Sequence, residues 1–164
     1  MIEPKVIEAG AKRVWVLGDL HFGVRANSQE WLAIQKQFFE ELFIPTLKKH
    51  VKPGDVLVQV GDTFDNRQSI NIKVLNYAVD LFERLGEILP VYVIVGNHDI
   101  WAKKTNEVSS IDTLKWIPNV QIYKDPELLK WSGRNILLMP WRRDTTHETE
   151  TLAEYPQSDV VFCH

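Results

Sequence analysis

The sequence has very little sulfur chemistry: Cys163 is the single cysteine among 164 residues. One cysteine forms no internal disulfide, which suits a reducing compartment, and it excludes a zinc finger built on several thiolates. Cys163 follows the apolar run Val-Val-Phe at 160–162. We therefore expect it to be a core residue of a buried strand rather than a nucleophile.

Basic charge and long apolar runs are also scarce. Nineteen Lys and Arg stand against 22 Asp and Glu, a net charge of −3, so no overall basic field indicates nucleic-acid binding. A bound metal can still supply positive charge locally. No apolar run approaches the roughly 18 residues of a membrane span, and residues 1–5 do not resemble a signal peptide. We expect a cytoplasmic protein with no membrane association.

What the sequence does contain is an alternation of strand and helix signals. Apolar strand-like runs occur at 13–17, 55–60 and 91–95, and amphipathic helical patterns follow the first two, the second over about 70–86. This order predicts an α/β fold with mainly parallel strands and helices on the sheet faces. Further strands are expected at 120–123, 128–131, 136–139 and 159–163, with a turn at 132–135. We expect one domain over residues 1–164.

The first helical pattern carries large apolar residues at helical spacing. Trp31, Ile34, Phe38 and Leu42 define a stripe, which Phe39, Phe43 and Leu47 widen, and we expect it to be core rather than a stacking platform. Pro45 lies inside the same pattern and is expected to kink or end the helix, because proline lacks the backbone N–H that a helix interior uses.

Polar side chains follow the strands where each strand ends. Because the carboxyl ends of parallel strands meet at one edge of a sheet, these side chains should lie together. After a single strand they would fit a polar turn as well as a site, but their recurrence favours a metal centre. The candidate residues are Asp19, His21, Asp62, Asp65, Asn97, His98 and His164.

Carboxylate, imidazole and amide oxygen together suit divalent ions such as Mn²⁺, Fe²⁺ or Zn²⁺, with Mg²⁺ as a further option. Seven such groups are enough for two metals, which clamp a phosphoryl group when about 3.5–4 Å apart. Asp62, on the middle loop, is the natural bridging carboxylate. His98 suits a general acid, and either Asp65 or Asp99 is available to accept its other N–H.

The segments Asp19-Leu-His21, Gly61-Asp62-Thr-Phe-Asp65 and Gly96-Asn-His-Asp99, with a strand-ending His164, resemble in order and spacing the motifs of the calcineurin-like metallophosphoesterases. The resemblance implies a β-sandwich flanked by helices, with two metals at the strand ends. It assigns Asp19 and His21 to the first metal, Asp62 to both, and Asn97 and His164 to the second. It makes His98 the catalytic acid and Asp65 the residue that orients it.

Within that family, residues 18–23, 62–67 and 139–141 are most similar to the SbcD-type DNA repair nucleases and their bacteriophage recombination-endonuclease relatives. This similarity implies manganese-dependent cleavage of DNA and an SbcC-type ATPase partner. It also suggests a homodimer in which the helix at 70–86 pairs with its copy, although packing of this helix on its own sheet is the simpler account. Arg67 is a candidate phosphate contact. The alternatives are a small-molecule phosphodiesterase or phosphatase, or an inactive fragment.

The family pattern continues with a Gly-His-x-His motif beyond the residue that matches His164. We therefore expect the domain to be truncated at its C-terminus, lacking one histidine ligand for each metal. The 164 residues alone are expected to bind metal weakly and to show little or no activity, whereas the full-length protein is expected to be the enzyme.

Overall fold

The computed structural model describes residues 5–6, 13–102 and 105–164. The expectation that the N-terminus is not a signal peptide concerns residues 1–5, of which 1–4 lie outside the described residues. The described chain forms two four-stranded sheets, in the orders β2-β3-β4-β5 and β1-β6-β7-β8. The first sheet is parallel throughout. Its strands are β2 (Val14–Leu17), β3 (Val56–Gln59), β4 (Val91–Ile94) and β5 (Val120–Tyr123).

The second sheet contains one antiparallel pair, β6 with β7, and is otherwise parallel. Its strands are β1 (Lys5–Val6), β6 (Glu127–Trp131), β7 (Arg134–Met139) and β8 (Val160–Cys163). The turn between β6 and β7 is shorter than expected, because the strands continue to Trp131 and Arg134. Only Ser132 and Gly133 remain in it, both with positive φ, as a two-residue hairpin turn of type I′ requires.

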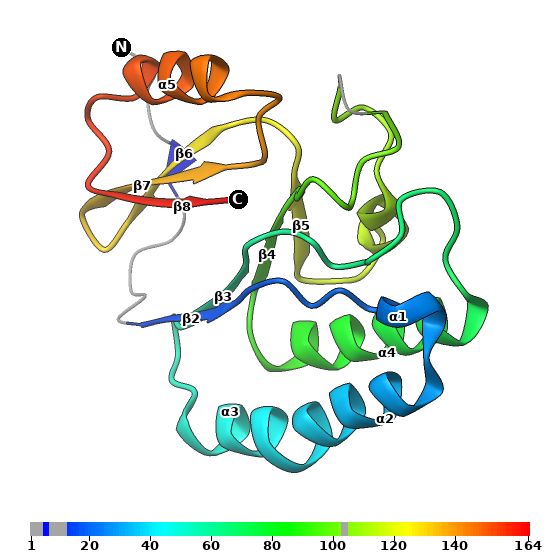
Figure 1. Cartoon of the computed structure of the whole chain (residues 1–164). Coiled ribbons are helices and arrows are strands. Elements are labelled where there is room, and N and C mark those ends of the chain that lie inside the picture. The colour runs from blue at the N-terminus through cyan, green and yellow to red at the C-terminus, as the bar shows by residue number, and fades with distance from the viewer. Residues whose placement is uncertain (1–4, 7–12, 103–104) are drawn as a thin grey trace.

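Helices cover the outer face of each sheet (Figure 1). The first sheet is covered by the helices between its strands, and α5 lies on the second sheet beyond it. The helical elements are α1 (Val24–Asn27), α2 (Gln29–Gln37), the π-helix η1 (Phe38–Phe43), α3 (Ile44–His50), α4 (Ile72–Ile88), the 3₁₀-helix η2 (Ser110–Leu114) and α5 (Thr145–Glu154). Among the described residues, no helix combines the length and apolarity needed to cross a bilayer.

The two sheets pack face to face around a core of their own. Every second residue of the central strands points into it, as the pleat dictates. Its residues from the first sheet are Val56, Val58, Tyr92, Ile94 and Tyr123, and those from the second are Leu129, Trp131, Ile136 and Leu138. The expected β-sandwich of mainly parallel strands flanked by helices is therefore confirmed.

A larger core lies between the first sheet and its helices. Asn71 caps α4 by accepting a hydrogen bond from the Lys73 backbone N–H, at 2.9 Å. The apolar face expected for this helix is buried as predicted, which fixes α4 against its own sheet. Its buried residues include Val74, Tyr77, Ala78, Leu81, Phe82 and Leu85.

Four residues of the apolar stripe expected to be core on the first helix are instead exposed, whereas Phe39 and Leu47 of the same stripe are buried. The exposed fractions are 38% for Trp31, 55% for Ile34, 42% for Phe38 and 58% for Leu42. The buried face of this helical segment joins Phe39 and Leu47 to Leu32 and Ile44, which lay outside the expected stripe. This segment has two overlapping apolar faces with helical spacing, and only packing against α4 and the sheet decides between them.

The helix also continues past Pro45, which was expected to kink or end it. Residues Phe38–Phe43 form a π-helix, in which the Ile44 N–H donates to the Phe39 carbonyl, five residues back. Pro45 lies just after this π-helix, in the first turn of α3. The helical segment therefore reaches His50 without a break.

Cys163 is exposed, which corrects the expectation of a core thiol. The reason is the position of β8, which pairs with β7 alone within the described chain and forms the edge of its sheet. Val160 and Val161 are exposed for the same reason, at 42% and 37%.

Glu40 of η1 is expected to make stability depend on pH through Arg84 of α4. The two side chains form a bidentate pair with both N–O distances at 2.7 Å. Hydrogen bonds from Arg84 lower the pKa of Glu40. The ion pair therefore contributes to the free energy of unfolding above the ordinary glutamate pKa, and this contribution is lost as pH falls through the lowered pKa. Because both side chains are partly exposed, we expect Glu40→Gln to lower the free energy of unfolding by only about 0.5–1 kcal/mol at pH 7.

The measurement is urea unfolding of both proteins between pH 7 and pH 3. The difference should shrink below about pH 4.3, where glutamate becomes protonated in the unfolded chain. Glu83→Gln, an exposed change on α4, serves as the control. A difference between Glu40→Gln and the native protein that stayed constant across this range would show that the ion pair does not contribute.

Candidate metal centre

Asp62 lies at the centre of the candidate residues, directly after β3. It is 4% exposed, and its backbone has a φ of 52°, which L-residues rarely adopt. Gly61, with a φ of 90°, makes the turn that carries it. The chain from the next loop crosses so closely that a Cβ on Gly96 would lie 2.2 Å from the Asp62 backbone nitrogen. Glycine at position 96 is therefore required by the approach of two loops.

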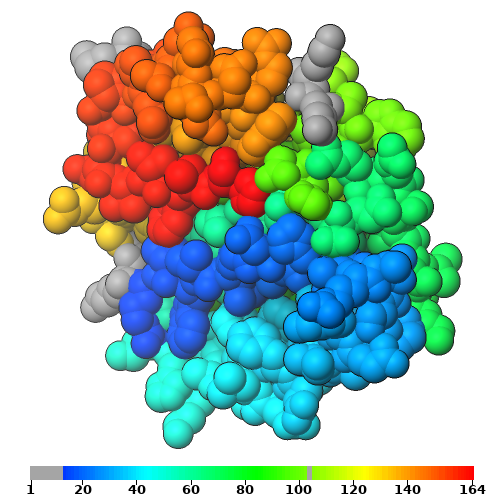
Figure 2. Space-filling view, in the orientation of Figure 1, coloured from blue at the N-terminus to red at the C-terminus, as the bar shows by residue number. Residues whose placement is uncertain are grey.

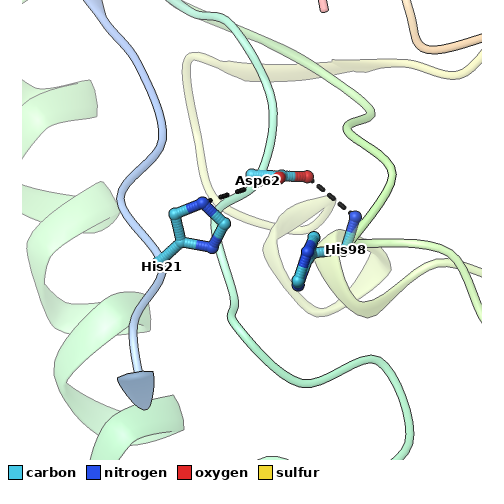
Figure 3. Close-up of side chains that lie close together, drawn as sticks. All are labelled: His21, Asp62 and His98. Atoms are coloured by element: carbon cyan, nitrogen blue, oxygen red, sulfur yellow. Dashed lines mark hydrogen bonds and ion pairs between the residues drawn. The ribbon is translucent and has the colours of Figure 1, made fainter. Parts of the chain in front are cut away.

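The Asp62 carboxylate is shared between groups from three other loops or strands. Its Oδ2 lies 3.6 Å from His21 Nε2, and its Oδ1 lies 3.4 Å from His164 Nε2. The same Oδ1 accepts a hydrogen bond from the His98 backbone N–H at 2.8 Å. Figure 3 shows His21 and His98 on either side of this carboxylate, around a common space. The two oxygens of one carboxylate thus face two different histidines.

His164 joins the end of β8 to the loops of the first sheet. Its Nδ1 donates to the Val60 carbonyl at 2.8 Å, and its Nε2 lies 2.9 Å from Asn97 Oδ1. Asp19 Oδ1 is 3.7 Å from Nδ1. In Figure 2 the red C-terminal residues meet the blue first loop and the green loop after β4 in the middle of the visible face. The two sheets therefore contribute to one site.

Asp65 contacts both histidines of the pair in Figure 3, with different atoms. Its backbone carbonyl accepts a hydrogen bond from His98 Nδ1 at 2.6 Å. Its carboxylate Oδ1 instead lies 3.5 Å from Nδ1 of His21. The rings of His21 and His98 meet edge to face with centroids 5.0 Å apart. Asp65 thus contacts His98 as expected of an orienting residue, but it does so with its backbone carbonyl rather than its carboxylate.

Asp99 is buried and ties two loops together rather than lining the site. Its Oδ1 accepts the backbone N–H groups of Thr63 and Phe64 at 3.0 and 3.2 Å, and its Oδ2 accepts that of Gly96 at 3.0 Å. Burial raises the pKa of Asp99 to about 6, against these hydrogen bonds, which lower it. Its carboxylate therefore braces the loops that carry Asp62 and His98.

The electrostatics of the site favour a charged Asp62 beside a charged His164. Burial alone would raise the pKa of Asp62, but hydrogen bonds from the His164 ring and the His98 N–H outweigh it, and the pKa is lowered. Burial likewise opposes the charge of His164, yet its contacts with Asp62 and the Val60 carbonyl raise its pKa. Both shifts have the direction that favours positive charge beside Asp62, which a divalent ion would also supply.

Three of the candidate residues have left-handed backbone conformations. Asp19, His21 and Asp62 have φ values of 46°, 43° and 52°. Such conformations persist only when the surrounding structure holds them, and they cluster at functional sites. The His21 N–H donates to the Asp62 carbonyl at 2.9 Å, which links two of the three. The first two loops thus hold each other in the conformation that gathers their side chains.

The donor set fits divalent metals. Two clusters have ligand atoms that all lie within 4.8 Å of one another: His21, Asp62 and His98, and Asp19, Asp62 and His164. Asp62 belongs to both, as a bridging carboxylate must. Nδ1 of His164 donates to a backbone carbonyl, the usual arrangement for a histidine whose Nε2 binds metal. The clusters join Asp19 with His164 and His21 with His98, so the expected division of ligands between two metals stays a prediction.

Arg67 lies half-buried in the loop after β3. Within the described part of the chain, no hydrogen bond or ion pair joins it to the other candidate residues. Its substrate contact therefore stays a prediction.

Two buried polar residues near the turn of Asp62 were not predicted from the sequence. Gln59 and Thr63 are both 0% exposed. The signal for Gln59 was present, since a single polar residue in an otherwise apolar buried strand needs partners. The signal for Thr63 was its position inside the Gly-Asp-Thr-Phe-Asp segment.

The family model for calcineurin-like phosphoesterases matches residues 12–164, which is nearly the whole chain and includes every candidate ligand. The chain belongs to the calcineurin-like phosphoesterases. Members of this family are hydrolases that use divalent metals, and the donor clusters around Asp62 agree with that chemistry.

Similar proteins in this phosphoesterase family include a subunit of a phage nuclease. The chain is 31% identical over 150 residues to Exonuclease subunit 1 of Enterobacteria phage T4, a match that covers 90% of this chain and 43% of that protein. It is 25% identical over 123 residues to Uncharacterized protein R555 of Acanthamoeba polyphaga mimivirus, covering 74% of this chain and 9% of that one. The chain thus spans less than half the length of these curated relatives.

A solved structure supports the fold of this phosphoesterase. The crystal structure of a protein of unknown function from Aquifex aeolicus aligns with a TM-score of 0.53 at 20% identity, covering 90% of this chain and 75% of that one.

Asp99→Asn is expected to destabilise this phosphoesterase by about 2–4 kcal/mol, although the change is nearly isosteric. Both carboxylate oxygens accept backbone N–H groups, and Oδ1 also accepts the Ser110 hydroxyl at 3.5 Å. The NH₂ of asparagine would face at least one of those N–H donors, and both donors would then be buried without an acceptor. Each unsatisfied buried donor costs about 1–3 kcal/mol of stability.

Guanidinium unfolding at pH 8, where Asp99 is charged, measures this loss. Asp125→Asn, a change of the same kind at an exposed position, is the control and should stay within about 0.5 kcal/mol of the native protein. Equal stability of the two variants would mean that Asp99 does not brace the loops.

Proposed function

We propose that this phosphoesterase is a metal-dependent phosphodiesterase with a dinuclear centre, and that its substrate is DNA. The observation that carries the proposal is the Asp62 carboxylate, whose two oxygens face His21 on one side and His164 on the other. Similarity to a phage protein named as an exonuclease subunit supports the choice of DNA. One domain over residues 1–164 would hold the part of the centre described above.

Five residues are proposed as metal ligands. Asp62 would be shared by both ions, and Asn97 and His164 would hold one of them, since their polar atoms already lie 2.9 Å apart. Asp19 and His21 would complete the set from the first loop. When bound, the ions supply positive charge to the phosphoryl oxygens and lower the pKa of a bound water. Mn²⁺ is the proposed ion, with Fe²⁺, Zn²⁺ or Mg²⁺ as alternatives.

His98 is proposed as the general acid. A carbonyl oxygen only accepts, so the contact with Asp65 places a proton on Nδ1 and leaves Nε2 to hold or release the proton that moves. The Asp65 carbonyl therefore fixes the ring orientation and the tautomer. From Nε2, the protonated ring would donate to the leaving oxygen of the phosphodiester.

The biological setting is proposed from the resemblance of the motifs to SbcD-type nucleases, and the phage exonuclease subunit supports a nuclease. We propose roles in DNA repair and recombination, with an SbcC-type ATPase as the partner subunit and a homodimer as the assembly. The apolar face of α4 is taken up by its own sheet. A dimer contact through α4 would therefore use its exposed residues, such as Ile72, which is 71% exposed.

His98→Gln in the full-length protein tests the proposal. We expect kcat for linear duplex DNA with Mn²⁺ to fall by about 10²–10⁴-fold, the usual contribution of a positioned acid. Mn²⁺ affinity, measured by titration calorimetry, should stay within about threefold, because the backbone N–H that contacts Asp62 is retained. His147→Gln, which replaces an exposed histidine, is the matched control and should change neither quantity.

Two results would contradict this assignment. If His98→Gln lost Mn²⁺ binding, His98 would be a ligand, as its place in a donor cluster with His21 and Asp62 also allows. If the native protein left DNA intact but hydrolysed a small aryl phosphodiester, the protein would be a small-molecule phosphodiesterase of the same family.

A further inference from the structure

Gln59 is a polar residue in a strand that is otherwise apolar and fully buried. It ends β3, all four residues of which are buried, and its own exposed fraction is 0%. A carboxamide offers two donors and one oxygen acceptor with two lone pairs, and burial without partners is costly. Its presence here calls for a partner, and the next turn of the chain supplies one.

The Gln59 side chain closes around Gly61, the residue before Asp62. Its Nε2 donates to the Gly61 carbonyl at 2.6 Å, and its Oε1 accepts the Gly61 N–H at 3.2 Å. The Thr63 hydroxyl donates to the same Oε1 at 3.3 Å. One side chain thus binds the residues on both sides of Asp62.

This turn needs to be held. Gly61 and Asp62 both have positive φ, at 90° and 52°, and a non-glycine residue in that region relies on its surroundings. Asp99 holds the far side of the turn through the Thr63 and Phe64 N–H groups. Gln59 holds the near side, from within the strand.

We propose that Gln59 is a positioning residue of the metal centre. Its carboxamide fixes the turn over residues 61–63, so that the two Asp62 oxygens face His21 and His164. It touches no candidate ligand atom of Asp62 and acts through the Gly61 backbone and the Thr63 hydroxyl. The inference rests on the proposed metal centre, but it adds a residue that lies outside the Gly-Asp-Thr-Phe-Asp segment.

The experiment compares Gln59→Met with Leu47→Ala in the full-length protein. Methionine matches glutamine in length but makes none of the three hydrogen bonds. Leu47 is 0% exposed in α3, a helix that lies beside the amino ends of β2 and β3 (Figure 1), so Leu47→Ala destabilises the fold without touching the turn. The readouts are Mn²⁺ affinity by titration calorimetry and amide hydrogen exchange at Gly61 relative to Leu57 in the same strand.

We expect Gln59→Met to weaken Mn²⁺ affinity by about 10–100-fold, as loss of a supporting contact behind a ligand does. Exchange at Gly61 should rise relative to Leu57. Leu47→Ala should leave Mn²⁺ affinity unchanged even if it unfolds at a lower temperature. Mn²⁺ affinity of Gln59→Met within twofold of the native value, with native exchange at Gly61, would overturn the proposal.

A second variant and a second readout keep the result decisive. If Gln59→Met does not fold, the isosteric Thr63→Val removes one of the three bonds and should still weaken Mn²⁺ affinity by about threefold or more; an unchanged affinity would refute the positioning role. If the native protein binds no Mn²⁺, the proposed metal function fails. Exchange at Gly61 in Gln59→Met, or in Thr63→Val if the former does not fold, then decides on its own whether Gln59 holds the turn.

Discussion

Replacing Asp62 with asparagine is expected to remove high-affinity Mn²⁺ binding and to reduce phosphodiester hydrolysis by about 10³-fold or more. Asp62 is the one residue shared by both donor clusters. The variant replaces a charged oxygen with an NH₂ group that binds no cation, so the site loses both the bridge and the negative charge. A metal contributes several kcal/mol of transition-state stabilisation, and each 1.36 kcal/mol corresponds to a factor of ten.

The Asp62→Asn variant should still fold. Its Oδ1 can continue to accept the His98 N–H, and its backbone contacts with the first loop do not involve the carboxylate. The measurements are calorimetric titration with Mn²⁺ and hydrolysis of duplex DNA by the full-length protein, with circular dichroism to confirm the fold. Asp80→Asn, on the exposed face of α4, is the control. Two Mn²⁺ ions bound by Asp62→Asn as tightly as by the native protein would rule out the bridging role.

Gly96→Ala is expected to be the most destabilising single change in the site, by about 3 kcal/mol or more. A Cβ at this position would lie 2.2 Å from both the backbone nitrogen and Oδ1 of Asp62, and 3.0 Å from its Cγ. Such distances cannot be relieved by a side-chain rotation, because the nearest atom belongs to a buried backbone. Overpacking of buried sites typically costs about 1–3 kcal/mol, and a clash with backbone lies at the upper end or beyond.

Gly133→Ala is the matched control for Gly96→Ala. No atom lies within 4 Å of a Cβ built at Gly133, so only its φ of 78° opposes the substitution. That strain costs about 1–2 kcal/mol. Urea unfolding of both variants gives the comparison, and Gly96→Ala should also weaken Mn²⁺ binding because Asp62 must move. Equal stabilities would show that the two loops have room to separate.

Much of the candidate site was predictable because its residues follow parallel strands. Strand pairing brings the residues after β2, β3 and β4 to one edge, so Asp19, Asp62 and Asn97 had to be neighbours once the strand order was recognised. The helix face of α4 was predictable for a similar reason, since its apolar residues form one unambiguous stripe. For both the strand-end residues and the face of α4, the local sequence pattern allows only one spatial arrangement.

Other features depended on packing that no local pattern encodes. The first helix offers two apolar faces, and burial of Phe39 rather than Phe38 follows from its position over the sheet. Exposure of Cys163 follows from the place of β8 at a sheet edge. Asp65 reaches His98 through its carbonyl because the loop runs past the ring, an arrangement that residue types do not specify.

The sequence by itself determined the α/β class, the family motifs and the candidate donor residues, because each of these depends on local order and spacing. Only the tertiary structure decided which atoms meet. It set the two oxygens of Asp62 between His21 and His164, and it placed Gln59 and Asp99 on either side of the same turn. The physical reason is that Gln59 on β3 and Asp99 after β4 hold the turn in its left-handed conformation only once these strands have paired. His164 in turn reaches Asp62 only once the second sheet has packed on the first.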